Sequence, residues 1–138
     1  MPKFGEILVP GGVISEVLLK FDNVSKDIVN ATKSWLKIRD VTDNDTLKIL
    51  IDELNGAEAE VIHAALEENI EWVILDDQKA RKTAHKYGLN VIGILGFLAW
   101  AKKEGYITSF FAEIEALRKQ GFYASFRLIK MLLDEVGE

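Results

Sequence analysis

The chain contains no cysteine and only two histidines among its 138 residues. Without cysteine there is no disulfide framework, no thiolate zinc site and no cysteine nucleophile. Two histidines are also too few for a histidine-rich metal site. Any bound metal would therefore be held by oxygen atoms, which favours magnesium or manganese.

Long apolar runs are missing as well. No stretch approaches the length that a membrane-spanning helix needs, and residues 1–10 lack the basic start and long apolar centre of a secretory signal. We therefore expect a cytoplasmic protein without a membrane partner.

Positive charge is in deficit, since 17 Lys and Arg oppose 22 Asp and Glu and give a net charge of −5. This balance argues against a protein that wraps nucleic acid non-specifically, because neutralisation of phosphates dominates such binding. It does not exclude an enzyme that acts on nucleic acid. Clustered carboxylates make an empty pocket negative, and a bound cation reverses the local sign.

What the chain does have is enough apolar sequence, 49% of its residues, to build one core. We expect a single domain over residues 1–138 of the α/β class: a three-layer sandwich around a mostly parallel sheet, with a helix-rich C-terminus. Strands are predicted near residues 6–9, 35–41, 72–75 and 90–92. Helices are predicted at about residues 13–21, 25–34, 44–54, 57–69, 78–87, 94–104, 110–120 and 125–136.

The stretch 71–81, EWVILDDQKAR, is the centre of this interpretation. Its apolar, β-branched run reads as a strand covered by helices on both faces. Asp76 and Asp77 follow at the carboxyl end of that strand, which is where open parallel sheets bind ligands. The alternative is structural, because an Asp is also a preferred cap for the helix that follows.

Two further acids are expected at the same edge of the sheet. Helix starts and strand ends lie on one edge of an alternating unit, so Glu58, in the first turn of the helix before the strand, belongs there with Asp76 and Asp77. Glu16, early in the helix after the first strand, belongs there too. Convergent carboxylates near helix starts suit a hard divalent cation. The alternatives are a first-turn acid favoured by the helix dipole for Glu58, and a surface residue for Glu16.

The predicted helix after Asp77 is basic on its outer face and has Ala80 and Ala84 on its inner face. A solvated face is the default explanation for these cations. Beside a metal pocket, however, they would carry the phosphates of a polyanionic substrate. The cations are Lys79, Arg81, Lys82 and Lys86, with His85 beside them as a surface residue, and we expect Lys79, Arg81 and Lys82 to bind substrate. His63 is predicted to pack at a helix edge.

Four motifs together resemble the PIN-domain proteins, and most of all an uncharacterised subgroup related to VapC-type toxins. They are P-x-x-V-x-x-E ending at Glu16, E-A-E beginning at Glu58, V-I-L-D-D-Q-K-A-R ending at Arg81, and G-L-N-V-I-G-I-L-G-F-L-A-W-A-K-K-E-G-Y-I beginning at Gly88. The resemblance implies a metal-dependent endoribonuclease that binds Mg²⁺ or Mn²⁺ with acids on one sheet edge. By position it makes Glu16, Glu58 and Asp77 catalytic, and adds Asp76 as a further metal ligand without an assigned role.

The chain departs from the family pattern at its start. Such domains open with a strand ending in Asp and then a helix, and this sequence begins after both, so we expect an N-terminally truncated member. The strand edge left unpaired favours a homodimer or higher oligomer. The partners implied are RNA and, for a VapC-type toxin, an antitoxin protein. Two alternatives stay open. One is a non-catalytic PIN-like interaction or assembly protein. The other is a phosphatase or phosphotransfer domain using Asp76 or Asp77 as nucleophile, although this adjacent pair lacks the surrounding signature of such domains, such as a spaced D-x-D.

Overall fold

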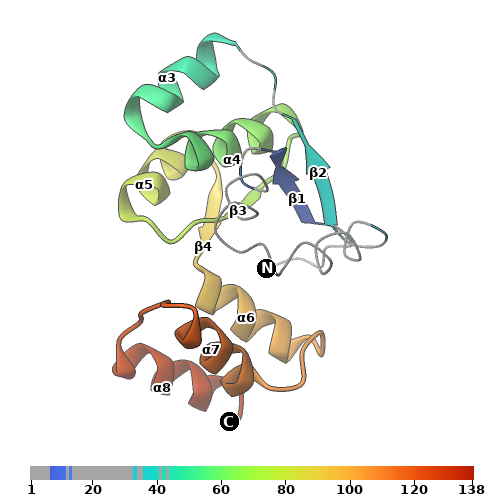
Figure 1. The fold of residues 1–138 in the computed structure, drawn as a ribbon, viewed down its shortest axis with the longest axis vertical. Coiled ribbons are helices and arrows are strands. Elements are labelled where there is room, and N and C mark those ends of the chain that lie inside the picture. Colours follow the sequence, from blue (N-terminus) through green and yellow to red (C-terminus); the bar gives the residue numbers. More distant parts are fainter. Residues whose placement is uncertain (1–6, 12, 14–32, 34–35, 41, 43) are drawn as a thin grey trace. The chain divides into compact units, whose positions relative to one another are not determined.

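A computed structural model describes residues 7–11, 13, 33, 36–40, 42 and 44–138 of the chain. Figure 1 shows their order of strands and helices. The elements are β1 (Ile7–Pro10), β2 (Leu36–Arg39), α3 (Asp45–Glu53), α4 (Gly56–Glu67), β3 (Trp72–Ile74), α5 (Gln78–Lys86), β4 (Asn90–Ile92), α6 (Ile94–Lys103), α7 (Phe110–Lys119) and α8 (Phe126–Glu135). The chain divides into two compact units, residues 1–91 and 92–138, which are described separately.

The alternation of short strands with helices confirms the predicted α/β class. Strand β1 pairs with β2 in parallel, with Ile7 opposite Leu36 and Val9 opposite Ile38, and β3 pairs with β4. Helices alone follow β4, so the predicted helix-rich C-terminus is also confirmed. The helices predicted near residues 13–21 and 25–34 lie largely outside the described residues.

Capping side chains fix the starts of the helices in the first unit. The Oδ1 atom of Asn44 accepts a hydrogen bond from the backbone N–H of Leu47 at 3.1 Å, and Asn55 accepts one from Glu58 at 3.0 Å. Each bond satisfies a donor that has no partner within its own helix. The start of the helix predicted at about residues 44–54 is therefore confirmed, and Asn55 begins α4 directly after α3 ends.

The core of the first unit lies between α3, α4, α5 and strand β3. Leu50, Ile62, Ala80 and Ala84 are fully buried in it. In the sequence, Leu47, Leu50, Ile51 and Leu54 recur at helical spacing and predict one apolar face, and Ile62, Ala65 and Leu66 are predicted to be buried. Leu47, Leu50, Leu54, Ile62 and Ala65 are indeed buried, and Leu66 is half-buried. The same prediction is wrong for Ile51, which is 46% exposed, because it lies one residue, about 100° of helix, beyond Leu50.

Helices α6, α7 and α8 form the second unit around Phe110 and Ile114, which are almost completely buried. The predicted apolar stripe of α6 was Ile94, Phe97, Leu98 and Ala101. The structure confirms Ala101 as buried and packs the half-buried Leu98 against the core, but it also buries Leu95 and Ala99, whereas Ile94 and Phe97 are only half-buried. Phe97 stacks on Trp100 with ring centroids 5.9 Å apart. None of the helices described is both long and apolar enough to cross a bilayer.

Candidate functional site

The junction of β3 and α5 places two adjacent carboxylates at the surface. Val73 and Leu75 are buried, whereas Asp76 and Asp77 are exposed immediately afterwards. The chain therefore leaves the core at the carboxyl end of β3, which is the turn that the sequence predicted. Such a strand end is where α/β proteins commonly place their ligand-binding residues.

Asp77 also has a structural role. It is the residue before α5, and its Oδ2 atom accepts a hydrogen bond from the backbone N–H of Ala80 at 3.0 Å. One carboxylate oxygen thus caps the helix. This is the structural role that was the alternative interpretation of the two aspartates. A carboxylate has lone pairs on both oxygens, so this bond does not use up its capacity to accept or ligate.

Glu58 occupies the first turn of α4 and is half-buried. Its backbone N–H donates to Asn55, and α4 packs against both β1 and β3. The helix that carries Glu58 therefore contacts the strand that leads to Asp76 and Asp77. A first-turn acid is stabilised by the positive end of the helix dipole whether or not it binds a ligand.

The predicted group of four acids stays a prediction, because Glu16 lies outside the described residues. Within the part of the chain that is described, no three His, Asp or Glu side chains form a group able to hold a metal ion. Glu58, Asp76 and Asp77 do not make such a group by themselves. Their oxygen atoms are nevertheless of the kind that Mg²⁺ and Mn²⁺ prefer, and Mg²⁺ often binds only one or two carboxylates and completes its shell with water.

Helix α5 presents the basic face that the sequence predicted. Ala80 and Ala84 are fully buried, which confirms the inner face, while Arg81 is half-buried. The buried Thr83 was not predicted, and its hydroxyl donates to the carbonyl oxygen of Lys79 at 3.0 Å. The exposed cations are Lys79, Lys82 and Lys86, and the exposed His85 lies beside them. They lie on the helix that begins at Asp77.

The sequence did not predict a polar network on α4. His63 is 2% exposed, and its Nε2 atom lies 2.9 Å from the carbonyl oxygen of Thr42 and 3.1 Å from Oε1 of Glu67. The backbone N–H of Thr42 donates to the same Glu67 oxygen at 3.2 Å. Hydrogen bonds from Thr42, with smaller help from His63 and Arg39, hold the pKa of Glu67 below its usual value. The His–x₃–Glu spacing was the available signal.

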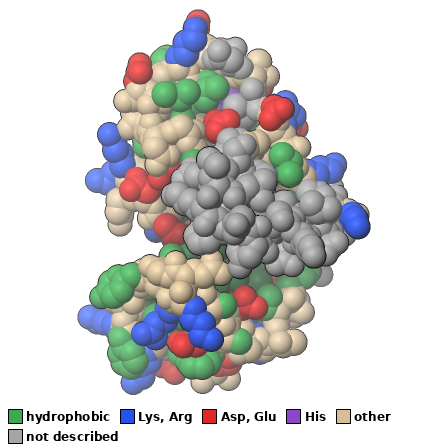
Figure 2. Space-filling model, viewed as in Figure 1, with side chains coloured by type: hydrophobic (Ala, Val, Ile, Leu, Met, Phe, Trp, Pro, Cys, Tyr) green, Lys and Arg blue, Asp and Glu red, His purple; other side chains and the backbone are tan. Residues whose placement is uncertain are grey.

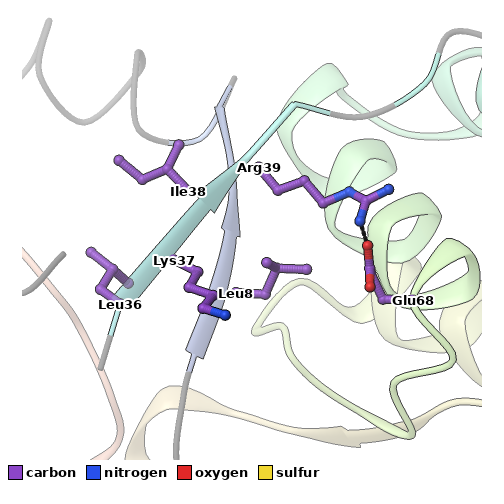
Figure 3. A pocket seen from close by; sticks show the side chains of 6 residues that line it. All are labelled: Leu8, Leu36, Lys37, Ile38, Arg39 and Glu68. Atoms are coloured by element: carbon purple, nitrogen blue, oxygen red, sulfur yellow. Dashed lines mark ion pairs between the residues drawn. The ribbon is translucent and has the colours of Figure 1, made fainter. Parts of the chain in front are cut away.

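A hollow beside β1 and β2 contains none of the predicted site residues. Leu8, Leu36 and Ile38 supply apolar side chains, and Arg39 forms an ion pair with Glu68 at its rim (Figure 3). Its mixture of apolar and paired charged groups gives it no evident chemistry of its own. The β3–α5 junction therefore remains the candidate functional site.

Comparison with known proteins supplies the family. A family model for the PIN domain matches residues 2–138. The chain belongs to the PIN-domain family. This membership indicates a nuclease-type function in general terms, with divalent metal and RNA as the usual requirements. No curated protein and no solved structure matches the chain.

Proposed function

We propose that this PIN-domain protein is a metal-dependent endoribonuclease. The observation that carries the proposal is the exposed pair Asp76 and Asp77 at the carboxyl end of β3, within a chain that the PIN-domain model matches almost completely. Glu16, Glu58 and Asp77 act as the catalytic acids, and Asp76 joins them as a ligand for Mg²⁺ or Mn²⁺. The match over residues 2–138 also supports one PIN domain built from both compact units.

The residues around the junction have three different roles in this proposal. The carboxylates hold the cation, which, when bound, lowers the pKa of a water molecule and stabilises charge on the phosphate. Lys79, Arg81 and Lys82 of α5 attract the RNA backbone by charge. The buried Ala80 and Ala84 anchor α5, so its cations keep their place relative to Asp77.

The test is cleavage of single-stranded RNA with Mn²⁺ by the wild type and by Asp77→Asn, Asp76→Asn and Glu58→Gln. The asparagine at position 77 keeps an oxygen for the Ala80 N–H and removes the charge that a metal needs. The matched control is Asp45→Asn, because Asp45 is an exposed acid in the first turn of another helix, α3.

We expect Asp77→Asn and Glu58→Gln to lose cleavage and the calorimetric heat of Mn²⁺ binding together, while Asp45→Asn keeps both. Full cleavage by Asp77→Asn and Glu58→Gln would contradict the assignment of the acids. Calorimetry is included because it reports the metal site independently of turnover.

A second candidate function is a non-catalytic PIN-like interaction or assembly protein. It is favoured by the bond from Ala80 to Asp77, which explains an acid at this position without any metal. Intact RNA and no heat of Mn²⁺ binding from the wild type would support it.

We further propose that the ribonuclease is a VapC-type toxin that acts in the cytoplasm as a homodimer or higher oligomer and is held inactive by an antitoxin. Induced expression of the wild type, compared with Asp77→Asn, tests toxicity directly. Light scattering of the purified protein measures its mass in solution, and a monomer would contradict the oligomer.

A further inference from the structure

Two aromatic side chains of the second unit are far more exposed than packing requires. Tyr123 is 89% exposed and Phe126 is 80% exposed, the two highest values among the exposed large hydrophobic residues described. The turn that carries Tyr123 is itself anchored, since its neighbours Phe122 and Ala124 pack against the core of this unit. The Tyr123 ring therefore projects from a turn that its neighbours hold in place.

Positive charge is concentrated around these rings. The second unit contains six Lys and Arg and six Asp and Glu, yet residues 118–130 hold four of the cations and none of the acids. The four are Arg118, Lys119, Arg127 and Lys130. Arg118 pairs with Glu115 at 3.4 Å, whereas no described carboxylate pairs with the other three. An electropositive segment thus lies within a chain of net charge −5.

The backbone brings the rings and cations to one place. Phe126 begins α8 and Lys130 lies one helical turn after it, so the two side chains are neighbours. Phe126 lies three positions after Tyr123, which limits their Cα atoms to about 11 Å apart. Figure 2 shows hydrophobic and basic side chains side by side at the edge of this unit where Figure 1 draws the turn between α7 and α8.

We propose that the 118–130 surface, meaning Tyr123 and Phe126 with Lys119, Arg127 and Lys130, binds single-stranded RNA. Unpaired bases stack on exposed aromatic rings whatever their sequence, and cations beside the rings contact the phosphates. Tyr, Phe and Arg are common in protein interfaces as well, but a segment with four cations and no acid is better matched by a polyanion than by a protein surface of mixed charge. The choice of RNA as the ligand rests on the proposed function, while the surface itself is separate from the acids assigned to cleavage.

The test measures binding without cleavage. Fluorescence anisotropy follows a labelled single-stranded RNA of about 12 nucleotides, a length in the range of known single-strand sites, with the full chain in EDTA. We expect the wild type to bind, and Tyr123→Ala and Phe126→Ala each to raise Kd about tenfold through lost stacking. Lys130→Gln and Arg127→Gln should each reduce the slope of log K against log salt by about 0.7.

Matched controls come from elsewhere in the chain. Phe111→Ala removes another exposed ring of the second unit, 53% exposed, and Lys48→Gln removes an exposed lysine of α3. Both should bind RNA as the wild type does. Circular dichroism of every variant checks that the fold is retained.

Three outcomes would overturn the inference: no RNA binding by the wild type, equal binding by Tyr123→Ala and Phe126→Ala, or equal losses in the controls. Binding to anionic vesicles, or self-association that these two variants abolish, in place of RNA binding would assign the surface to a membrane or to a second copy. Because EDTA removes the metal, failure of the nuclease proposal leaves this binding result interpretable.

Discussion

The Nε2 atom of His63 donates to the carbonyl oxygen of Thr42 across 2.9 Å, and this bond ties α4 to the segment that follows β2. A carbonyl oxygen only accepts, so Nε2 carries a proton. Glu67 completes the network of these residues, since it accepts a hydrogen bond from the Thr42 N–H and lies beside the same histidine nitrogen. A buried imidazole therefore holds the C-terminal half of α4, the helix that also carries Glu58, against Thr42.

Replacing His63 should destabilise the protein. His63→Ala leaves the Thr42 carbonyl without its donor and opens space beside α4, which we expect to lower the free energy of unfolding by about 2 kcal/mol. Urea unfolding followed by circular dichroism measures this. The control is His85→Ala on the exposed face of α5, which should stay within about 0.5 kcal/mol of the wild type. Equal effects of the two variants would contradict a structural role for the Thr42 bond.

The carboxylate of Glu138 makes the second unit sensitive to pH. Its oxygens accept from the backbone N–H groups of Phe110 at 2.7 Å and Phe111 at 3.1 Å, and Ser109 and Lys102 lie close by. The bonds from the start of α7 hold the pKa of Glu138 below its usual value of 4.5. The stabilisation is therefore present above that value and is lost as the pH falls through the lower pKa of the folded state.

We expect the Glu138→Gln variant to be less stable than the wild type at pH 7. It should also lose less stability than the wild type on acidification. Thermal unfolding from pH 7 down to about pH 3, near and below the ordinary carboxyl range, measures both effects. Parallel stability profiles for the two proteins over this range would show that the carboxylate at the start of α7 does not contribute.

Asp77 allows its structural role to be separated from its chemical one. Asp77→Ala removes the cap of α5 and should cost about 1 kcal/mol of stability, whereas Asp77→Asn keeps an acceptor oxygen and should remain close to the wild type. Chemical denaturation of the three proteins in EDTA measures the difference. If asparagine costs as much as alanine, the negative charge at the helix start stabilises α5 more than the hydrogen bond does.

Features encoded within a few residues were predictable from the sequence. Asn44 begins α3, and Gly88 ends α5 with a φ of +83°, a conformation that glycine adopts without strain. The end of β3 at the two aspartates follows from the apolar run before them. Each of these features depends on neighbours along the chain, so local chemistry was enough.

Features that depend on distant partners were less accessible. The predicted face of α6 was right for Leu98 and Ala101 but missed Leu95, because ILGFLAWA is apolar nearly all round and periodicity could not choose between Ile94 and Leu95. Thr42 and His63 meet across 21 positions of sequence, and no local pattern announces that bond. The meeting of Glu16 with Glu58 and Asp77 is likewise a question of tertiary structure, and it stays a prediction.

The parallel pairing of β1 with β2 has a kinetic consequence. Ile7 must find Leu36, 29 positions later, whereas α6, α7 and α8 join through short turns. Closing a long loop costs conformational entropy before any contact offsets it, and this makes the step slow. The C-terminal helices should therefore form early and the strand pair late. Until β1 and β2 pair, each strand has unpaired backbone groups that can bind a strand of another chain. We therefore expect newly made chains to be prone to aggregation.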